Sequence, residues 1–164
     1  MLPGKLQLRI VSADHSLVTE EVDEVEIPGA DGYFGVLPGH TELVAMLGAG
    51  ELWYRTGPLE AEDQKHYLAL AFGFAEVQPD SVTILADVAE KSHEIDVARA
   101  EAAKKRAEER IAHGTNAGLQ GSGASGGTNV APRAIDDMDL ERARIALMKS
   151  LIRLQVASRA KIRS

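Results

Sequence analysis

The stretch from Gly29 to His40, GADGYFGVLPGH, constrains the fold of this chain more than any other segment. Four of its twelve residues are glycine, and they enclose a short apolar run, Tyr33–Leu37. Glycine is favoured where the backbone needs a positive φ or must pass close to another segment. The pattern therefore predicts a short strand held between tight turns in a β-rich domain.

The rest of residues 5–88 alternates polar and apolar side chains over short runs. Lys5 to Ile10 has period two, which is typical of a strand with one buried face. All seven aromatic residues of the chain lie in this part, as expected if it holds the core. Many short strands with frequent turns favour a β-sandwich or a flattened barrel. Further strand-like runs are expected at 24–27, 52–55 and 81–87, and a series of shorter runs at 65–70, 72–74 and 75–77.

The pattern becomes helical after the strands. Residues 92–113 are rich in alanine, lysine, arginine and glutamate, with Ser92 as a candidate N-cap and Gly114 as the expected end. Residues 114–135 are rich in glycine, serine and alanine, which predicts a flexible linker. Residues 136–163 are acidic at the start and basic at the end, which complements the dipole of a second helix. We expect a β-sandwich domain over 1–90 and a helical domain over 91–164.

The net charge of −7 conceals two opposite contributions. Residues 1–91 carry 16 acidic and 5 basic side chains, and residues 92–164 carry 9 acidic and 13 basic ones. A basic segment such as 92–164 is compatible with binding to nucleic acid, to an acidic membrane or to an acidic protein surface, and also with helices that are simply solvated. Nucleic acid is disfavoured because no aromatic residue follows Phe74 to stack on bases.

No catalytic constellation is visible. The chain lacks cysteine, a phosphate-binding G-x-x-x-x-G-K-[ST] loop, an H-E-x-x-H pair and an apolar run of 18 residues, so we expect neither a metal site nor a membrane span. The glycines of the first motif lack the βαβ context of a dinucleotide site. Asp96 and Arg99 share a helix face, where an intrahelical ion pair is the simplest interpretation.

Three segments together resemble the epsilon subunit family of F-type ATP synthase, called delta in mitochondria. They are I-P-G-A-D-G-Y-F-G-V-L-P-G-H-T-E-L from Ile27, F-G-F-A-E-V-Q-P-D-S-V-T-I-L-A-D from Phe72, and I-D-V-A-R-A from Ile95, which runs into R-A-E-E-R-I from Arg106. The resemblance implies a sandwich of about ten strands followed by a two-helix hairpin. It also implies a non-catalytic rotor subunit, peripheral to the cytoplasmic face of the bacterial inner membrane.

In that family the sandwich binds the gamma subunit and the c-ring, and so helps couple ion flow to ATP synthesis. The helical hairpin permits turnover when folded on the sandwich and inhibits ATP hydrolysis when extended into the catalytic head. No cofactor is required, although some members bind regulatory ATP. By resemblance, the turn and rotor-interface residues are Gly29, Gly32, Phe34, Gly35, Pro38, Gly39 and His40.

Two further residue sets follow from the resemblance. The residues expected to contact the catalytic head are Arg142, Arg144, Lys149 and Arg153. The residues expected to bind ATP are Glu90, Asp96, Arg99, Arg106, Lys149 and Arg153. Glu42 and the long linker depart from the family pattern, and the linker weakens the case for the ATP site, which needs both helices together. The alternatives are a stand-alone ATP-sensing module and a β-sandwich adaptor that docks on a coiled coil.

Overall fold

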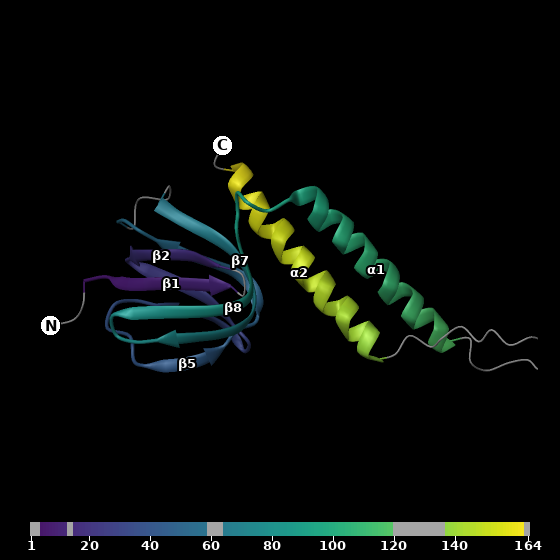
Figure 1. Ribbon diagram of the computed structural model, residues 1–164, viewed down its shortest axis with the longest axis horizontal. Helices are drawn as coiled ribbons and strands as arrows, with labels where there is room; N and C mark the ends of the chain where they lie inside the picture. The colour runs from purple at the N-terminus through teal and green to yellow at the C-terminus, as the bar shows by residue number, and fades with distance from the viewer. Residues whose placement is uncertain (1–3, 13–14, 59–63, 120–136, 163–164) are drawn as a thin grey trace, which may run out of the picture. The chain divides into compact units, whose positions relative to one another are not determined.

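The computed structural model describes residues 4–12, 15–58, 64–119 and 137–162, and the chain divides into two units (Figure 1). The first unit comprises Met1–Ile95 together with Ile152–Ser164, and the second comprises Asp96–Leu151. In this division the end of the last helix is grouped with the strands, and the domain boundary expected at residue 90 stays a prediction.

The first unit is an N-terminal β-sandwich. Its described residues form eight strands, which corrects the expected number of about ten. The strands are β1 (Leu6–Ser12), β2 (Ser16–Val22), β3 (Glu24–Gly29), β4 (Gly32–Val36), β5 (Leu43–Met46), β6 (Ala49–Arg55), β7 (Lys65–Val77) and β8 (Ser81–Lys91).

The strands follow the order β2-β1-β8-β7-β6-β3-β4, and β5 pairs with β7 outside this path. The pair β1–β8 is parallel, and the other pairs among these strands are antiparallel. Two strands, β2 and β5, were not predicted. In β2 only Val18 and Val22 are buried, and β5 has four residues, so neither shows a clear alternating pattern.

Strand β7 belongs to both layers of the sandwich, because it changes neighbours along its length. Its first part, Lys65–Ala71, pairs with β6, and its last part, Phe74–Val77, pairs with β5. Between them Phe72 and Gly73 have positive φ values of 59° and 112°. A Cβ at Gly73 would collide with the carbonyl oxygen of Leu85, so only glycine fits this bend.

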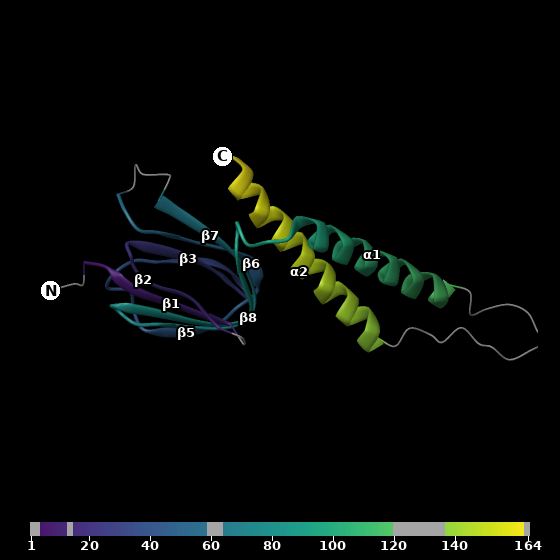
Figure 2. The ribbon, with the colours of Figure 1, turned by 45° about the horizontal axis from the view of Figure 1, so that its top comes forward.

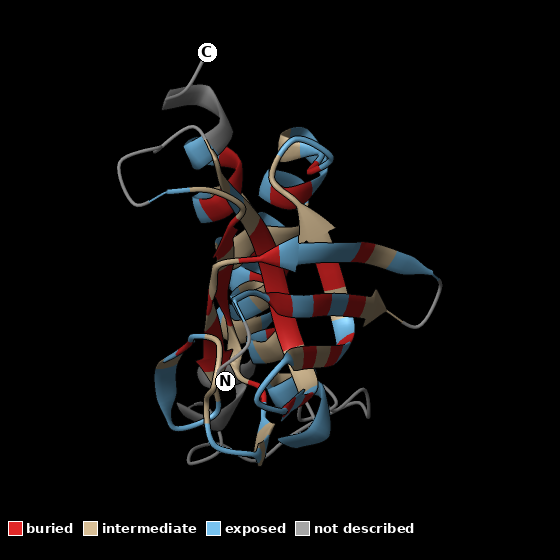
Figure 3. Ribbon diagram, turned by 90° about the vertical axis from the view of Figure 1, so that its left-hand side faces the viewer, coloured by how far each residue is buried: buried red, intermediate tan, exposed pale blue. Residues whose placement is uncertain are grey.

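Alternation along the strands forms the core. In β1, Leu6, Leu8 and Ile10 are buried while Gln7 and Arg9 are exposed. Figure 3 shows this alternation as red and pale blue bands along the strands. Since successive strand residues point to opposite faces, each strand contributes one apolar face to the interior.

The glycine-rich motif forms the hairpin β3–β4 and the turn after it. Gly32 and Gly39 have φ values of 139° and 85°, and a Cβ at Gly29 would lie 2.7 Å from the carbonyl oxygen of Gly32. These three positions require glycine, as the sequence predicted. Gly35 differs, because open space surrounds its Cβ position.

The helix bounds correct the sequence-based ones. Helix α1 spans Val97–Leu119 and α2 spans Asp137–Ile162. Ser92 does not cap α1: it lies in a turn after β8, and its backbone N–H donates to the carbonyl oxygen of Tyr67 at 3.0 Å. The Asp96 carboxylate instead accepts the Arg99 N–H at 2.9 Å, so Asp96 is the cap.

Gly114 does not end α1, which continues for five more residues to Leu119. A single glycine inside a helix is tolerated at about 1 kcal/mol relative to alanine. The predicted linker, 114–135, is therefore helical at 114–119, and its remainder lies outside the described residues. The predicted helix ends at 136 and 163 also lie outside them.

In the second unit α1 and the first part of α2 run side by side (Figures 1 and 2). The buried side chains of this unit are small. Among the residues of this unit whose burial is described, they are Ala100, Ala107, Ala143 and Ser150, and the Ser150 hydroxyl donates to the Leu147 carbonyl oxygen at 2.7 Å within α2. Small side chains allow close helix approach but bury little apolar area.

Candidate functional site

The end of α2, which belongs to the first unit, presents one face with a distinct composition. Val156 lies three residues from both Arg153 and Arg159, so it neighbours each of them on the helix surface. Val156 and Ala157 are buried, and both arginines bond to carboxylates on the sandwich. This segment is therefore attached by apolar burial and by two charged contacts.

The first charged contact joins Arg153 to Glu90 at the end of β8. The Arg153 Nη2 and Nε atoms donate to Glu90 Oε1 at 2.6 and 2.9 Å. The two side chains keep 26% and 35% of their accessible surface. Charge-assisted hydrogen bonds of this length are stronger than neutral ones, although partial exposure to water reduces their contribution.

The second charged contact joins Arg159 to Glu51 of β6. The Arg159 Nε atom donates to Glu51 Oε2 at 3.2 Å, and the guanidinium carbon lies 5.7 Å from the centre of the Tyr67 ring. The Glu51 side chain is only 9% exposed, whereas that of Arg159 is 48% exposed. The hydrogen bond to Glu51 raises the pKa of Arg159 above its ordinary value.

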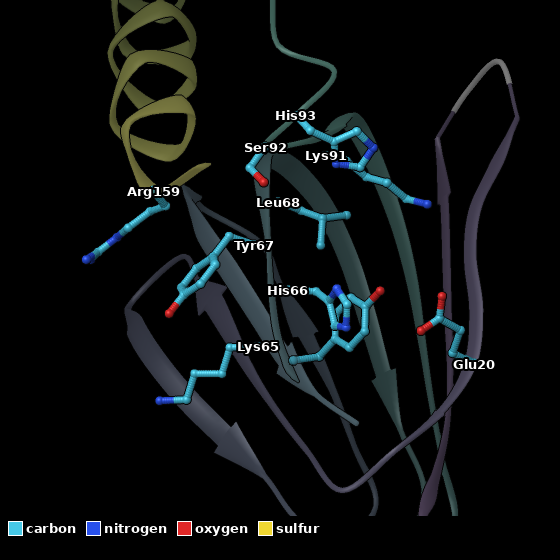
Figure 4. A pocket seen from close by; sticks show the side chains of 10 residues that line it. Glu20, Lys65, His66, Tyr67, Leu68, Lys91, Ser92, His93 and Arg159 are labelled. Atoms are coloured by element: carbon cyan, nitrogen blue, oxygen red, sulfur yellow. The ribbon is translucent and has the colours of Figure 1, made fainter. Parts of the chain in front are cut away.

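A hollow of about 290 Å³ adjoins this contact (Figure 4). In the close-up Arg159 comes from α2 beside Tyr67, and His66 and Glu20 lie farther along the wall. The rings of Tyr54 and His66 stack with centroids 4.9 Å apart. Burial first, and then the charge and hydrogen bond of Glu20, raise the pKa of Tyr54 above its ordinary value.

The six residues expected to bind ATP are distributed over both units. Glu90 and Arg153 lie in the first unit and bond to each other. Asp96, Arg99, Arg106 and Lys149 lie in the second unit. One oxygen of Asp96 is used by the helix cap, which replaces the intrahelical ion pair suggested by its spacing from Arg99.

The residues expected to contact the catalytic head also differ in their surroundings. Arg142 and Arg144 are exposed and pair within α2, with Asp139 at 3.3 Å and Glu141 at 3.5 Å. Lys149 is half-buried, and Arg153 bonds to Glu90. Arg142 and Arg144 are therefore the more accessible members of this set.

The predicted turn and rotor-interface residues lie together on β3, β4 and the loop that follows. Phe34 packs against the core, while Gly32 and Gly35 are exposed. The Gly39 N–H donates to the Pro79 carbonyl oxygen at 2.7 Å, and the His40 N–H donates to that of Leu37 at 3.1 Å. These bonds hold the loop that contains Pro38 near the turn between β7 and β8.

Sequence reasoning missed an apolar patch on the outer face of the sandwich. Neighbouring strands place Met46 of β5 beside Phe74 of β7, and Phe74 beside Leu85 of β8. With Val44, these side chains are 53–74% exposed. The sequence held a sign of this patch in β7 and β8. Phe74 and Leu85 are apolar although they alternate with the buried residues and so face outward. Glu51 and Tyr67 were also missed.

The comparisons with known proteins agree with this architecture. A family model described as "ATP synthase, Delta/Epsilon chain, beta-sandwich domain" matches residues 5–92. The chain belongs to the ATP synthase delta/epsilon family. The model of the family's long alpha-helix domain matches residues 93–121. The resemblance seen in the sequence is thus confirmed, and membership makes the chain a non-catalytic subunit of an ATP synthase.

Individual delta/epsilon relatives extend the match. The ATP synthase epsilon chain 2 of Syntrophotalea carbinolica is 38% identical over 155 residues, which cover 94% of this chain and 95% of the relative. The epsilon chain of Koribacter versatilis is 51% identical over 105 residues, 64% of this chain and 70% of the relative.

A chain in the cryo-EM structure of Euglena gracilis mitochondrial ATP synthase (OSCP/F1/c-ring) shares the fold. The TM-score is 0.67 at 22% identity, and the match covers 99% of this chain and 84% of that one. Over the part of the chain that the structure describes, neither helix has the length and apolar character of a membrane span.

Proposed function

We propose that this chain is a central-stalk rotor subunit of an F-type ATP synthase, in which it helps couple ion-driven rotation to ATP synthesis. The sandwich binds the gamma subunit through the apolar patch and meets the c-ring through the turn residues from Gly29 to His40. The helices inhibit ATP hydrolysis. The chain acts as a peripheral subunit on the cytoplasmic side of the membrane.

The apolar patch is the observation that carries this proposal. Val44, Met46, Phe74 and Leu85 form a continuous exposed apolar area on adjacent strands, and Val11 of β1 continues it opposite Leu85. Contiguous exposed apolar side chains mark interaction sites, whereas isolated ones do not. Family membership supports the gamma subunit as the occupant, because a rotor subunit needs a stable, largely apolar contact with the rotor shaft.

Co-elution with the cognate gamma subunit tests the proposal. Leu85→Asp places a charge inside the patch and should weaken binding by about 10–100-fold. Thr83→Asp is the matched control, since it adds the same charge to the same face of β8 but two residues away. Equal binding of both variants, or no co-elution of the unaltered chain with gamma, would contradict the proposal.

The inhibitory role is supported by the exposed arginines of α2. Arg142 and Arg144 keep 71% and 61% of their side-chain surface and suit an acidic surface on the catalytic head. ATP hydrolysis by the cognate head with gamma can be titrated with the full chain and with a chain that ends at Lys91. Inhibition by the full chain alone is expected, and equal inhibition by both chains would assign the effect to the sandwich.

Regulatory ATP is a second proposal about the same helices. Glu90, Asp96, Arg99, Arg106, Lys149 and Arg153 supply cations for a polyphosphate and carboxylates for the ribose or base. Glu90 and Arg153 already lie within hydrogen-bonding distance of each other. Titration calorimetry of the isolated chain should show saturable heat with ATP, and no heat at millimolar ATP would reject this site.

Family membership favours the rotor subunit over both alternatives. A stand-alone ATP sensor would bind ATP without associating stably with gamma. A general adaptor would bind a coiled coil other than the cognate gamma subunit. The co-elution experiment separates both from the rotor subunit.

A further inference from the structure

Glu51 is an unusual residue for the face of the sandwich on which it lies. It is one of the few buried charged side chains among the described residues, with 8% of its surface exposed. A buried carboxylate without a partner is costly, because it loses the water that solvates its charge. Glu51 forms an ion pair with Arg159, which lies 108 residues later in the chain.

The surroundings of Glu51 are well suited to an arginine side chain. The Tyr67 ring offers its face at 5.7 Å from the Arg159 guanidinium, a distance within the range of cation–π contacts. The Tyr33 hydroxyl accepts the Glu51 N–H at 3.3 Å, which fixes the backbone that carries the carboxylate. A guanidinium can donate to a carboxylate and contact an aromatic face simultaneously, which an ammonium does less well.

We propose that Glu51 and Tyr67 form a latch for Arg159, and that this latch keeps the C-terminal end of α2 on the sandwich without any nucleotide. The latch consists of a carboxylate acceptor, an aromatic wall and the arginine that they hold. Its presence does not depend on the proposed inhibitory function. Its consequence for ATP hydrolysis does rest on that function, because a docked helix cannot reach the catalytic head.

The latch is independent of nucleotide because its residues lie outside the candidate ATP set. Arg153 and Glu90 bond to each other and also belong to that set, so a bound triphosphate would compete for Arg153. Arg159, Glu51 and Tyr67 would keep their contacts in either case. The helix end therefore has one contact that a nucleotide would disturb and one that it would not.

Distance measurement between two spin labels tests the latch directly. The chain contains no cysteine, so Asp80→Cys on the sandwich and Ser158→Cys on α2 give a clean label pair on the full chain. Both positions are exposed. The docked helix should give a narrow distance distribution, and a released helix should give a broad one.

Arg159→Ala and Glu51→Gln should each lower the ratio of docked to released chain by about 3–10-fold, both with and without ATP. Arg159→Lys should have an intermediate effect. Lys5→Ala is the matched control, because it removes one charge of an exposed ion pair in the same unit and should leave the distribution unchanged. Fluorescence of Trp53, the one tryptophan, verifies that each variant is folded.

The outcomes separate the latch from the inhibitory function. Unchanged distances in both Arg159→Ala and Glu51→Gln would overturn the latch, whatever happens to hydrolysis. Docking of the unaltered chain only in the presence of ATP would overturn its independence from nucleotide. A broad distance distribution in the Arg159 and Glu51 variants, together with stronger inhibition of hydrolysis, would support both proposals. Released distances with no inhibition by any variant would support the latch and contradict the inhibitory function.

Discussion

The interior of the sandwich and the interior of the helical unit are built from side chains of different size. Leu8, Ile10 and Ile84 are at most 1% exposed in the sandwich, whereas the buried side chains among the described residues of the second unit are three alanines and a serine. Each buried methylene contributes about 0.8 kcal/mol. The sandwich therefore has the larger apolar interior, and the smaller interior of the helical unit is in keeping with the regulatory role that we propose for it.

Two spectroscopic probes can follow the units separately. Trp53 is the one tryptophan of the chain and lies in β6, so its fluorescence reports on the sandwich. Helix content, from circular dichroism in the far ultraviolet, reports mainly on α1 and α2. If the comparison is correct, helix signal is lost at lower urea concentration than the Trp53 signal changes.

Ile84→Ala should have the largest effect on this comparison. Ile84 is fully buried in β8, so the loss of its side chain should lower the free energy of unfolding by about 2–5 kcal/mol. Urea unfolding followed by Trp53 fluorescence measures the change. The control is Leu85→Ala in the same strand, where 55% exposure predicts an effect of about 0.5 kcal/mol or less. Similar effects of both variants would contradict the core assignment.

Tyr54→Phe should remove a pH dependence that is specific to the sandwich. Burial raises the pKa of Tyr54 in the folded chain above its ordinary value of 10.0, while the unfolded chain ionises near that value. The stabilisation that comes from keeping the Tyr54 phenol protonated in the folded chain is therefore complete below about pH 10 and is lost as the pH rises further.

Above about pH 10 the unaltered chain should lose about 1.4 kcal/mol per pH unit more than the variant. Urea unfolding near neutral pH and near pH 11 measures this difference. Near neutral pH the difference in the free energy of unfolding between the two chains should not depend on pH. The same difference at both pH values would show that Tyr54 ionises alike in the folded and unfolded chains.

Ala107→Gly should have a smaller effect, confined to the second unit. Ala107 is 3% exposed, so the variant loses both helix propensity, about 1 kcal/mol, and a buried methyl group. Ala102→Gly is the matched control, because Ala102 is exposed in the same helix and loses propensity alone. The helix signal should shift further for Ala107→Gly, with no change in the Trp53 transition. Equal shifts would mean that Ala107 contributes nothing to packing.

The sequence predicted the sandwich better than the helix ends, for physical reasons. Alternation in β1 is regular from Leu6 to Ile10, because the side chains of Leu6, Leu8 and Ile10 are all buried on one face. Strand β7 appeared as separate runs, since the positive φ of Phe72 and Gly73 interrupts its pattern while its pairing continues on either side. The start of α1 was misplaced because Ser92 and Asp96 are both good caps, and tertiary contacts of the β8 end decided between them.

The site was less predictable than the fold. The family pattern placed Glu90 and Arg153 among the residues expected to bind ATP, which stays a prediction, and the structure shows only that these two side chains bond to each other. The family pattern could not identify Glu51 and Tyr67 as partners of Arg159, because a pairing over 108 residues leaves no local pattern. The patch of Met46, Phe74 and Leu85 depends on the register of three strands, which only the pairing of β5, β7 and β8 reveals.

The smallest effect on stability, and a distinct one on function, should come from Arg142 and Arg144. Each forms an exposed ion pair within α2, so the double alanine variant should change the free energy of unfolding by about 0.5 kcal/mol or less. If these arginines contact the catalytic head, about 3–10 times more of the variant is needed for half-inhibition of hydrolysis.

The sign of this effect sharpens the contrast between the two parts of α2. Arginine loss in the second unit should weaken inhibition, while Arg159→Ala in the first unit should strengthen it by freeing the helix. Lys104→Ala on α1 is the control, because its ion pair with Glu108 is also exposed and intrahelical. Inhibition that weakens equally for the double alanine variant, for Arg159→Ala and for Lys104→Ala would contradict this contrast. It would mean that net charge, rather than position along α2, determines the interaction with the head.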